Sequence, residues 1–169
     1  MTIIGKILLA GIAFCVLASS VAAQNAKTMR EQLIGSWDMV SAVVTVDGTQ
    51  GEVFGPHPQG MLIFERNGRF VQIEITPGLA KFTSNSRDTG TPEENKAVVT
   101  ETLAFYGTWS VDEGARTVTY HVVAGTYPNF NGVDLKRLVT TLDATDLVWT
   151  NPTPSQGSGS GHVAWKRVK

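Results

Sequence analysis

Short apolar runs rich in β-branched and aromatic residues recur along most of the chain, separated by turn signals at a spacing of roughly ten residues. Short strands at this spacing are typical of an antiparallel sandwich or barrel. Eight antiparallel strands can close around an interior that side chains fill or that holds one small ligand. Eight runs fit the pattern: 39–46, 61–65, 69–75, 104–111, 117–124, 134–142, 147–151 and 162–168. The pattern therefore predicts an all-β fold of eight antiparallel strands.

Residues between these runs indicate a tight turn and one helix. Asn67 and Gly68 separate the second and third runs, and this dipeptide supplies the positive φ angles that a two-residue hairpin needs. Further on, Thr91 is suited to cap a helix, Pro92 fits its first position and Glu94 completes a capping box. We therefore expect a helix from Pro92 to about residue 102, between the third and fourth strands.

The first residues of the chain have the three parts of a secretory signal peptide. Lys6 supplies an early positive charge, an apolar run covers residues 7–18, and the small residues Val21 and Ala23 precede Gln24. The run is about a dozen residues long, shorter than the roughly 20 that a membrane-spanning helix needs, although an uncleaved anchor is the alternative. We expect cleavage after Ala23, a secreted or periplasmic protein, and one mature domain over residues 24–169.

Composition excludes several classes of chemistry. Cys15 is the one cysteine and leaves with the signal, so we expect no disulfide, thiolate ligand or cysteine nucleophile in the mature domain. The formal net charge is −1 and the basic residues form no stripe, so nucleic acid is not an expected partner. His57, His121 and His162 lie on distant segments without metal-ligand spacing, and no phosphate, dinucleotide or nucleophile-elbow motif occurs. We therefore expect neither a metal nor a cofactor.

One motif at the head of the first strand connects the chain to a known superfamily. Gly35-Ser36-Trp37 resembles the Gly-X-Trp signature of the lipocalins and their calycin relatives. In that superfamily the tryptophan plugs the closed end of the barrel, and an arginine near the last strand packs across its indole ring. Arg167 matches this arginine by position. The resemblance therefore implies a barrel base formed by Gly35, Trp37 and Arg167.

The chain is also similar to the bacterial and fungal lipocalin-like domain family over nearly all of its mature length. The matching segments are residues 33–37, 47–48, 55–64, 67–68, 92–94, 106–109 and Arg137. The order and spacing of these segments together carry the resemblance, because each segment alone is unspecific. The family is defined largely by its fold, so the resemblance implies an eight-stranded lipocalin-like (calycin) barrel and no catalytic residue.

Alternation along the strands suggests which side chains face the interior. If Trp37 faces inward, the period of two turns Met39, Ser41 and Val43 inward as well. This mixture of small and apolar groups suits a ligand pocket and a packed core equally.

Three polar residues on other strands complete the predicted ligand site: Glu74, His121 and Arg137. If they face inward, an arginine in an otherwise apolar barrel could fix a carboxylate headgroup. The same three groups could alternatively act as base, acid and anion clamp on an enclosed substrate.

These observations favour a monomeric, non-enzymatic exported protein that binds a small hydrophobic or amphipathic molecule in its barrel. Loops at 56–58 and 127–130 would control entry to the open end. Two alternatives stay open: a small isomerase or cyclase built on the same barrel, and a ligand-free envelope or stress protein. The second alternative would act through its surface, for which the Pro/Ser/Gly-rich segment 152–161 is suited.

Overall fold

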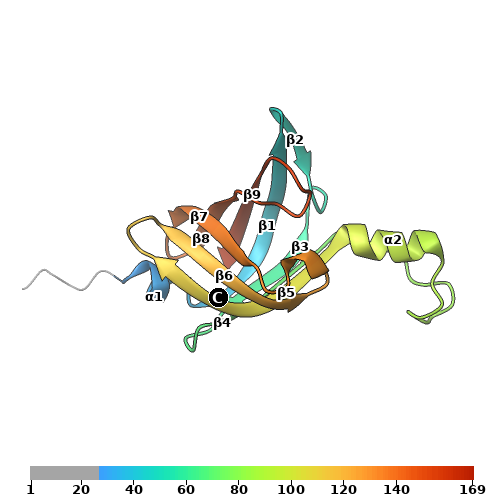
Figure 1. Ribbon diagram of the computed structural model, residues 1–169, viewed down its shortest axis with the longest axis horizontal. Coiled ribbons are helices and arrows are strands. Elements are labelled where there is room, and N and C mark those ends of the chain that lie inside the picture. The colour runs from blue at the N-terminus through green and yellow to red at the C-terminus, as the bar shows by residue number, and fades with distance from the viewer. Residues whose placement is uncertain (1–26) are drawn as a thin grey trace, which may run out of the picture.

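In the computed structural model, which describes residues 27–169, one antiparallel sheet closes on itself into a barrel (Figure 1). The predicted signal peptide and its cleavage site lie outside the described residues. The strands are β1 (Gly35–Val46), β2 (Thr49–Glu52), β3 (Gln59–Phe64), β4 (Arg69–Ile75), β5 (Thr102–Asp112), β6 (Thr117–Gly125), β7 (Asp134–Leu142), β8 (Asp146–Asn151) and β9 (Ser160–Arg167). The helices are α1 (Met29–Leu33), α2 (Pro92–Glu101) and the short 3-10 helix η1 (Pro128–Phe130).

Eight strands form the closed wall. Each of β3 to β8 pairs with the next strand along the chain, and β1 joins β3 on one side and β9 on the other. The short β2 pairs only with the end of β1, through a turn in which Asp47 and Gly48 have φ angles of 49° and 79°. Such positive angles at both turn positions are typical of a tight hairpin. The eight-stranded antiparallel barrel is therefore confirmed, and β2 is an added hairpin arm.

The predicted helix forms at the expected residues but at a different place in the strand order. Thr91 Oγ1 accepts from the Glu94 amide at 3.2 Å, and Glu94 Oε2 accepts from the Thr91 amide at 2.8 Å, which completes the capping box. The helix lies between β4 and β5, not between strands 3 and 4, because β2 adds a strand that the pattern missed. The four residues of β2 are exposed and include no apolar side chain, so no alternation signals the strand.

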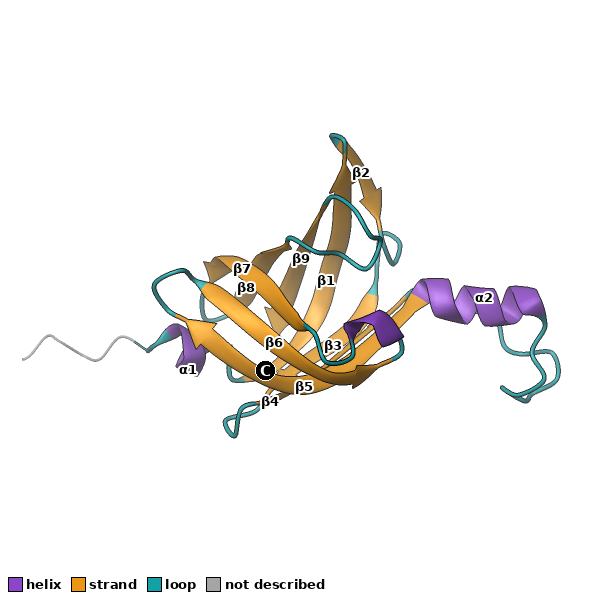
Figure 2. Ribbon diagram, viewed as in Figure 1, coloured by secondary structure: helices purple, strands orange, loops and turns teal. Residues whose placement is uncertain are grey.

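The two ends of the barrel differ. Figure 1 shows α1 at one end, called here the base, and α2 with the β1–β2 hairpin at the other, called the open end. Figure 2 shows α2 extending away from the wall, and all ten of its residues are exposed or half-buried. This helix therefore depends on its caps more than on packing.

A β-bulge changes which side chains of β1 face inward. Met39 pairs with Trp165 and Ser41 with Ala164, so Val40 is an extra residue without a partner on β9. An extra residue reverses the alternation beyond it. Ala42 then faces inward opposite Val163, while Ser41 and Val43 lie on the outer face. The prediction that Ser41 and Val43 face the interior is wrong for this reason, whereas Met39, before the bulge, is buried.

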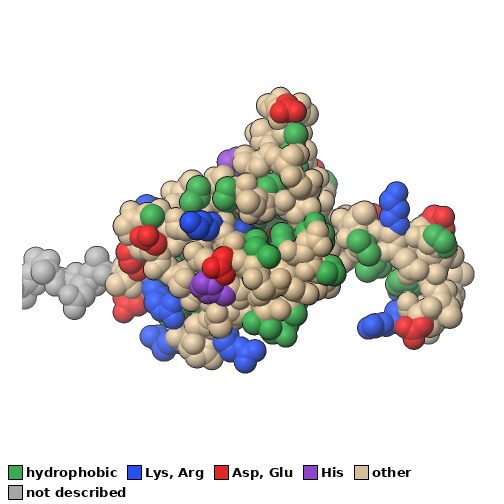
Figure 3. Space-filling model, viewed as in Figure 1, with side chains coloured by type: hydrophobic (Ala, Val, Ile, Leu, Met, Phe, Trp, Pro, Cys, Tyr) green, Lys and Arg blue, Asp and Glu red, His purple; other side chains and the backbone are tan. Residues whose placement is uncertain are grey.

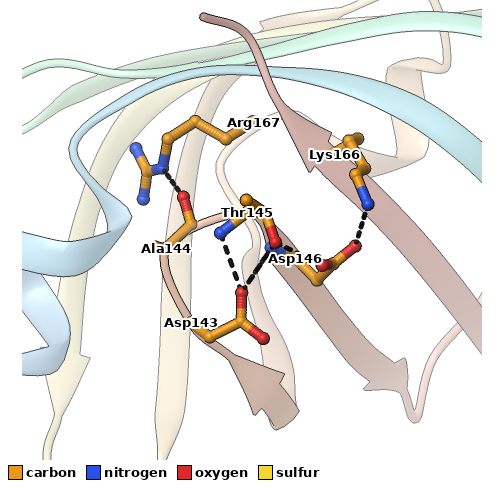
Figure 4. A network of polar contacts seen from close by, with 6 residues as sticks. All are labelled: Asp143, Ala144, Thr145, Asp146, Lys166 and Arg167. Carbon is orange, nitrogen blue, oxygen red and sulfur yellow. Dashed lines mark hydrogen bonds and ion pairs between the residues drawn. The ribbon is translucent and has the colours of Figure 1, made fainter.

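The base is built around Trp37 and Arg167. The Trp37 side chain is fully buried, its Nε1 donates to the Leu33 carbonyl at 2.9 Å, and the Arg167 guanidinium lies 4.0 Å from the ring centroid. Arg167 also donates to the carbonyl of Ala144 at 2.9 Å (Figure 4) and to those of Ile34 at 3.1 Å and Gln32. One side chain thus connects the segment after α1, the β7–β8 turn and β9.

Gly35 is required beside this contact. Its φ angle of 127° disfavours any other residue, and a Cβ there would lie 3.1 Å from Arg167 Nη1. The glycine therefore lets the first strand pass close beneath the guanidinium.

We expect Arg167→Ala to lower the free energy of unfolding by about 2 to 4 kcal/mol, because it removes a cation–π contact and leaves three carbonyls without their charged donor. Urea denaturation checks this value. Lys166→Ala is the matched control, since the neighbouring Lys166 forms an exposed 3.0 Å ion pair with Asp146 and should contribute little. Equal losses for the two variants would contradict a special role for Arg167.

Candidate functional site

The half of the interior nearer the base is filled by aromatic side chains. Phe70 stacks on Tyr120 with ring centroids 4.1 Å apart, and Phe64 lies 4.6 Å from Trp109. Trp149 and Trp165 follow at 5.8 Å from each other. These rings alternate inward along their strands, as the period of two requires. A ligand therefore has no space in this half without displacing the core.

The half nearer the open end contains a small polar cavity of about 40 Å³. Its apolar walls include Ala42, Phe105 and Val163, and its polar walls are Gln72, Glu74, Arg137 and Asn151. A space of this size holds a few water molecules or one small polar group, since one water needs roughly 10–15 Å³. It is far below the roughly 300–1,000 Å³ of a pocket that encloses a whole small-molecule ligand.

Glu74 and Gln72 reach this cavity from alternate positions of β4. Both side chains are buried, and Gln72 Nε2 donates to Glu74 Oε1 at 2.7 Å. Burial raises the pKa of Glu74 to about 7, while the hydrogen bond from Gln72 and the charge of Arg137 act in the opposite direction with smaller effect. The Glu74 carboxyl therefore carries a proton for much of the time near neutral pH.

Arg137 enters the cavity from β7 and is 2% exposed. Its Nη1 donates to Asn151 Oδ1 at 2.9 Å and to the Lys136 carbonyl at 3.0 Å, and the guanidinium lies 5.1 Å from the Tyr120 ring centroid. Burial lowers the pKa of Arg137, but guanidinium remains charged in proteins. No carboxylate among residues 27–169 lies within 4.0 Å of it as an ion-pair partner.

Four buried side-chain polar atoms in the interior have no hydrogen-bond partner within the described part of the chain. They are Gln72 Oε1, Tyr120 Oη, Trp149 Nε1 and Trp165 Nε1. Gln72 and Trp149 border the cavity itself. An unsatisfied buried polar atom costs about 1–3 kcal/mol, so a polar occupant that met these atoms would be stabilised.

An apolar groove of about 560 Å³ adjoins the cavity at the open end. Its walls come from the β1–β2 hairpin, the end of α2, the start of β5 and Tyr127, with apolar side chains at Val44, Val53, Val98 and Val99. Figure 3 shows apolar side chains gathered where α2 joins the barrel. Five residues border both the groove and the inner cavity: Val53, Phe54, Leu103, Ser155 and Gln156. The two spaces are therefore separated by a single layer of side chains.

The predicted ligand residues divide into three groups. Glu74 and Arg137 border the inner cavity, and Met39 is buried outside it. Ser41 and Val43 lie on the outer face, and Val43 nevertheless borders the cavity beside Ala42.

His121 also lies outside, contrary to the inward orientation considered from the sequence. Its Nδ1 lies 2.6 Å from Asp134 Oδ1 and its Nε2 lies 3.4 Å from Ser110 Oγ, all on exposed side chains. One face of β6 carries Val118, Tyr120 and Val122 and is the buried one, so the alternation of the strand turns His121 to the outer face. The wall of the barrel therefore separates His121 from Glu74 and Arg137.

Sequence reasoning missed several residues of the site. Gln72 could have been found, because it lies two positions before Glu74 and so on the same face of the strand. Asn151 and Trp149 follow from the same rule on β8, but the cover formed by Pro154, Ser155 and Gln156 has no such signal. Of the two predicted entry loops, the 127–130 loop borders these spaces, Tyr127 at the groove and Phe130 at the inner cavity.

Among residues 27–169, no group of three or more His, Cys, Asp and Glu side chains is placed to hold a metal ion. None of the helices in this part of the chain combines the length and the apolar character needed to cross a membrane.

A family model described as a lipocalin-like domain matches residues 34–168. The chain is similar to the crystal structure of a lipocalin-like protein from Bacteroides uniformis, with 14% identity, 81% of this chain and 99% of that chain covered, and a TM-score of 0.45. It is also similar to a redesigned β-barrel, with 14% identity, 85% and 100% coverage and a TM-score of 0.44. No curated protein matches the chain.

The burial of Glu74 predicts that the ligand-free protein loses stability as pH rises. Because the pKa is about 7 in the folded protein and near 4.5 when exposed, the folded state binds the proton more tightly. The resulting stabilisation is fully present below about pH 4.5 and is lost as pH rises through about 7, with a total on the order of 3 kcal/mol. Urea denaturation across this range checks the slope.

Glu74→Gln is the matched variant, because an amide has similar shape and does not titrate. We expect its stability to vary less with pH over the same interval. An unchanged slope in Glu74→Gln would show that another group causes the pH dependence.

Proposed function

Since the chain belongs to the lipocalin-like domain family, we propose that it binds a small amphipathic molecule at the open end of its barrel. The apolar part of the molecule lies in the groove between α2 and the β1–β2 hairpin, and its polar end reaches the inner cavity. The observation that carries the proposal is the shared wall between an apolar groove and a buried polar cavity.

The sizes of the two spaces decide how the ligand is arranged. The groove, at about 560 Å³, falls in the range of small-molecule sites, whereas the cavity, at about 40 Å³, does not. A wholly enclosed ligand in the lumen, as first expected from the fold, would require the aromatic core to move. An extended ligand that enters with one polar end requires only the separating layer to open.

The 152–159 loop is the part of that layer that we propose moves. Ser155 and Gln156 border both spaces, Pro154 borders the inner cavity, and the loop is rich in Gly, Ser and Pro. Gly159 anchors its end, because a Cβ there would lie 2.1 Å from the Thr45 carbonyl oxygen. Loops with few buried contacts open at low free-energy cost, so this segment can admit a ligand without disturbing the wall.

The proposal is limited to binding. A catalytic set of Glu74, His121 and Arg137 would need all three groups on one substrate, and His121 lies on the opposite side of the wall. Action through the outer surface is the remaining alternative, and it would not depend on the groove.

We also propose that the protein is exported, on the basis of the amino-terminal signal pattern, and that it acts as a monomer. Intact-mass measurement of the protein purified from culture medium or periplasm should give a chain that begins at Gln24. A full-length chain retained with the membrane fraction would contradict this cleavage.

Binding in the groove is tested with decanol, an uncharged apolar chain, titrated while it displaces the dye Nile red. We expect Val99→Asp, which places a charge in the groove, to weaken decanol binding by about tenfold, since one lost valine contact is worth on the order of 1.4 kcal/mol. Val123→Asp is the matched control, because Val123 is also exposed but lies outside the groove.

Equal binding by the two variants would place the dye and decanol elsewhere. Native mass spectrometry of protein from its own compartment, followed by extraction, would identify the natural ligand. A protein that binds neither decanol nor Nile red would overturn the proposed function.

A further inference from the structure

We propose that the inner cavity is a carboxylate site, in which the acid group of the ligand bonds to the Arg137 guanidinium and accepts a second hydrogen bond from the Glu74 carboxyl. This inference rests on the proposed function and specifies the chemical class of the ligand. It adds a charged end to a molecule that the groove alone would select only for apolar character.

Arg137 carries a buried positive charge that favours a nearby anion. A guanidinium that is 2% exposed is costly to bury unless an anion or several acceptors surround it. Both of its hydrogen bonds to residues 27–169 come from Nη1, and both acceptors are neutral. Glu74 interacts with this charge from beyond ion-pair distance, and its own burial favours the neutral form, so an incoming anion would supply a close counter-charge.

The orientation of the Arg137 guanidinium and the size of the cavity suit a carboxylate. Asn151 and the Lys136 carbonyl fix Nη1, which orients the guanidinium plane on the wall of the cavity. The other donors of the guanidinium form a planar fork that matches the two oxygens of a carboxylate. A cavity of about 40 Å³ suits such a small planar group and is tight for a bulkier phosphate ester.

Glu74, the acid in the same cavity, suits a carboxylate ligand when it is protonated. An ionised Glu74 would repel a second carboxylate, but a protonated Glu74 is a hydrogen-bond donor to it. Burial raises the pKa of Glu74 to about 7, so the protonated form is well populated before any anion enters. A bound anion would raise this pKa further, because like charges disfavour ionisation. Acid binding should therefore be accompanied by proton uptake.

Few other groups around Glu74 can titrate or carry charge. Gln72 beside it on β4 is neutral, and Arg137 on β7 is the one cation that contributes to its pKa. Tyr120 on β6 stays neutral because burial raises its pKa far above its usual value. From β5 the cavity receives Leu103 and Phe105, which do not titrate. The pH dependence of acid binding near neutral pH thus belongs to Glu74.

The test compares decanoic acid with decanol, which have the same chain and differ at the polar end. Isothermal titration calorimetry at about pH 6 should show decanoate binding at least tenfold more tightly than decanol. Arg137→Gln should remove this preference, so that the variant binds decanoate no more tightly than decanol. Lys136→Gln is the matched control, since the neighbouring Lys136 is exposed, and it should retain the preference.

A second measurement does not depend on the folding of the Arg137 variant. The heats of decanoate binding in phosphate and in Tris differ by the number of protons taken up multiplied by the difference between the ionisation enthalpies of the two buffers. At about pH 7 we expect uptake of about half a proton by the wild-type chain and none by Glu74→Gln. The affinity of wild-type protein for decanoate should fall as pH rises through 7, while decanol affinity stays constant.

The outcomes separate this inference from the function on which it rests. Equal affinity for decanoate and decanol, or proton uptake unchanged in Glu74→Gln, would overturn the carboxylate site and leave the binding function standing. Failure to bind either compound would overturn the binding function itself.

Discussion

The pairing of β1 with β9 is the constraint on which the rest of the molecule depends, because it closes the sheet and defines an inside. At the base, the closure is secured by Arg167, which packs on Trp37 and donates to carbonyls from segments distant in sequence. Near the middle of β1, the bulge at Val40 keeps the strand paired while it reverses the alternation of side chains. The inner lining toward the open end is set by that single extra residue.

Closure also fixes how much interior is left for a ligand. Aromatic rings from six strands fill the half near the base, so the packed core and the space for a ligand lie at different levels along the axis of the barrel. Toward the open end the same alternation brings Gln72, Glu74 and Arg137 inward, where burial costs them free energy. A fold that needed only a core would place apolar groups at these positions. Their presence beside an apolar groove is the basis for assigning this end to binding.

The sequence predicts the wall of the barrel well, because strand period, turn residues and capping signals are local. It fails where a property depends on distant segments. The short β2 has no apolar alternation, and the bulge at Val40 depends on register with β9, so Ser41 and Val43 were assigned to the wrong face. His121 was considered for the interior although the alternation of β6, with Val118, Tyr120 and Val122 on one apolar face, turns it outward. Glu74 was considered as an inward residue because of its carboxyl group. Its hydrogen-bond partner Gln72 was overlooked, because the alternation of β4 was not applied to the other polar residues of the strand.

The central claim is that an acid-ended apolar molecule occupies the open end, and a crystal structure of the protein with decanoate tests it most directly. The account predicts the carboxylate within hydrogen-bond distance of Arg137 and Glu74, the chain in the groove beside Val99, and the 152–159 loop displaced. Decanoate bound on the outer face of the barrel, or in the groove with its carboxylate in solvent, would contradict it.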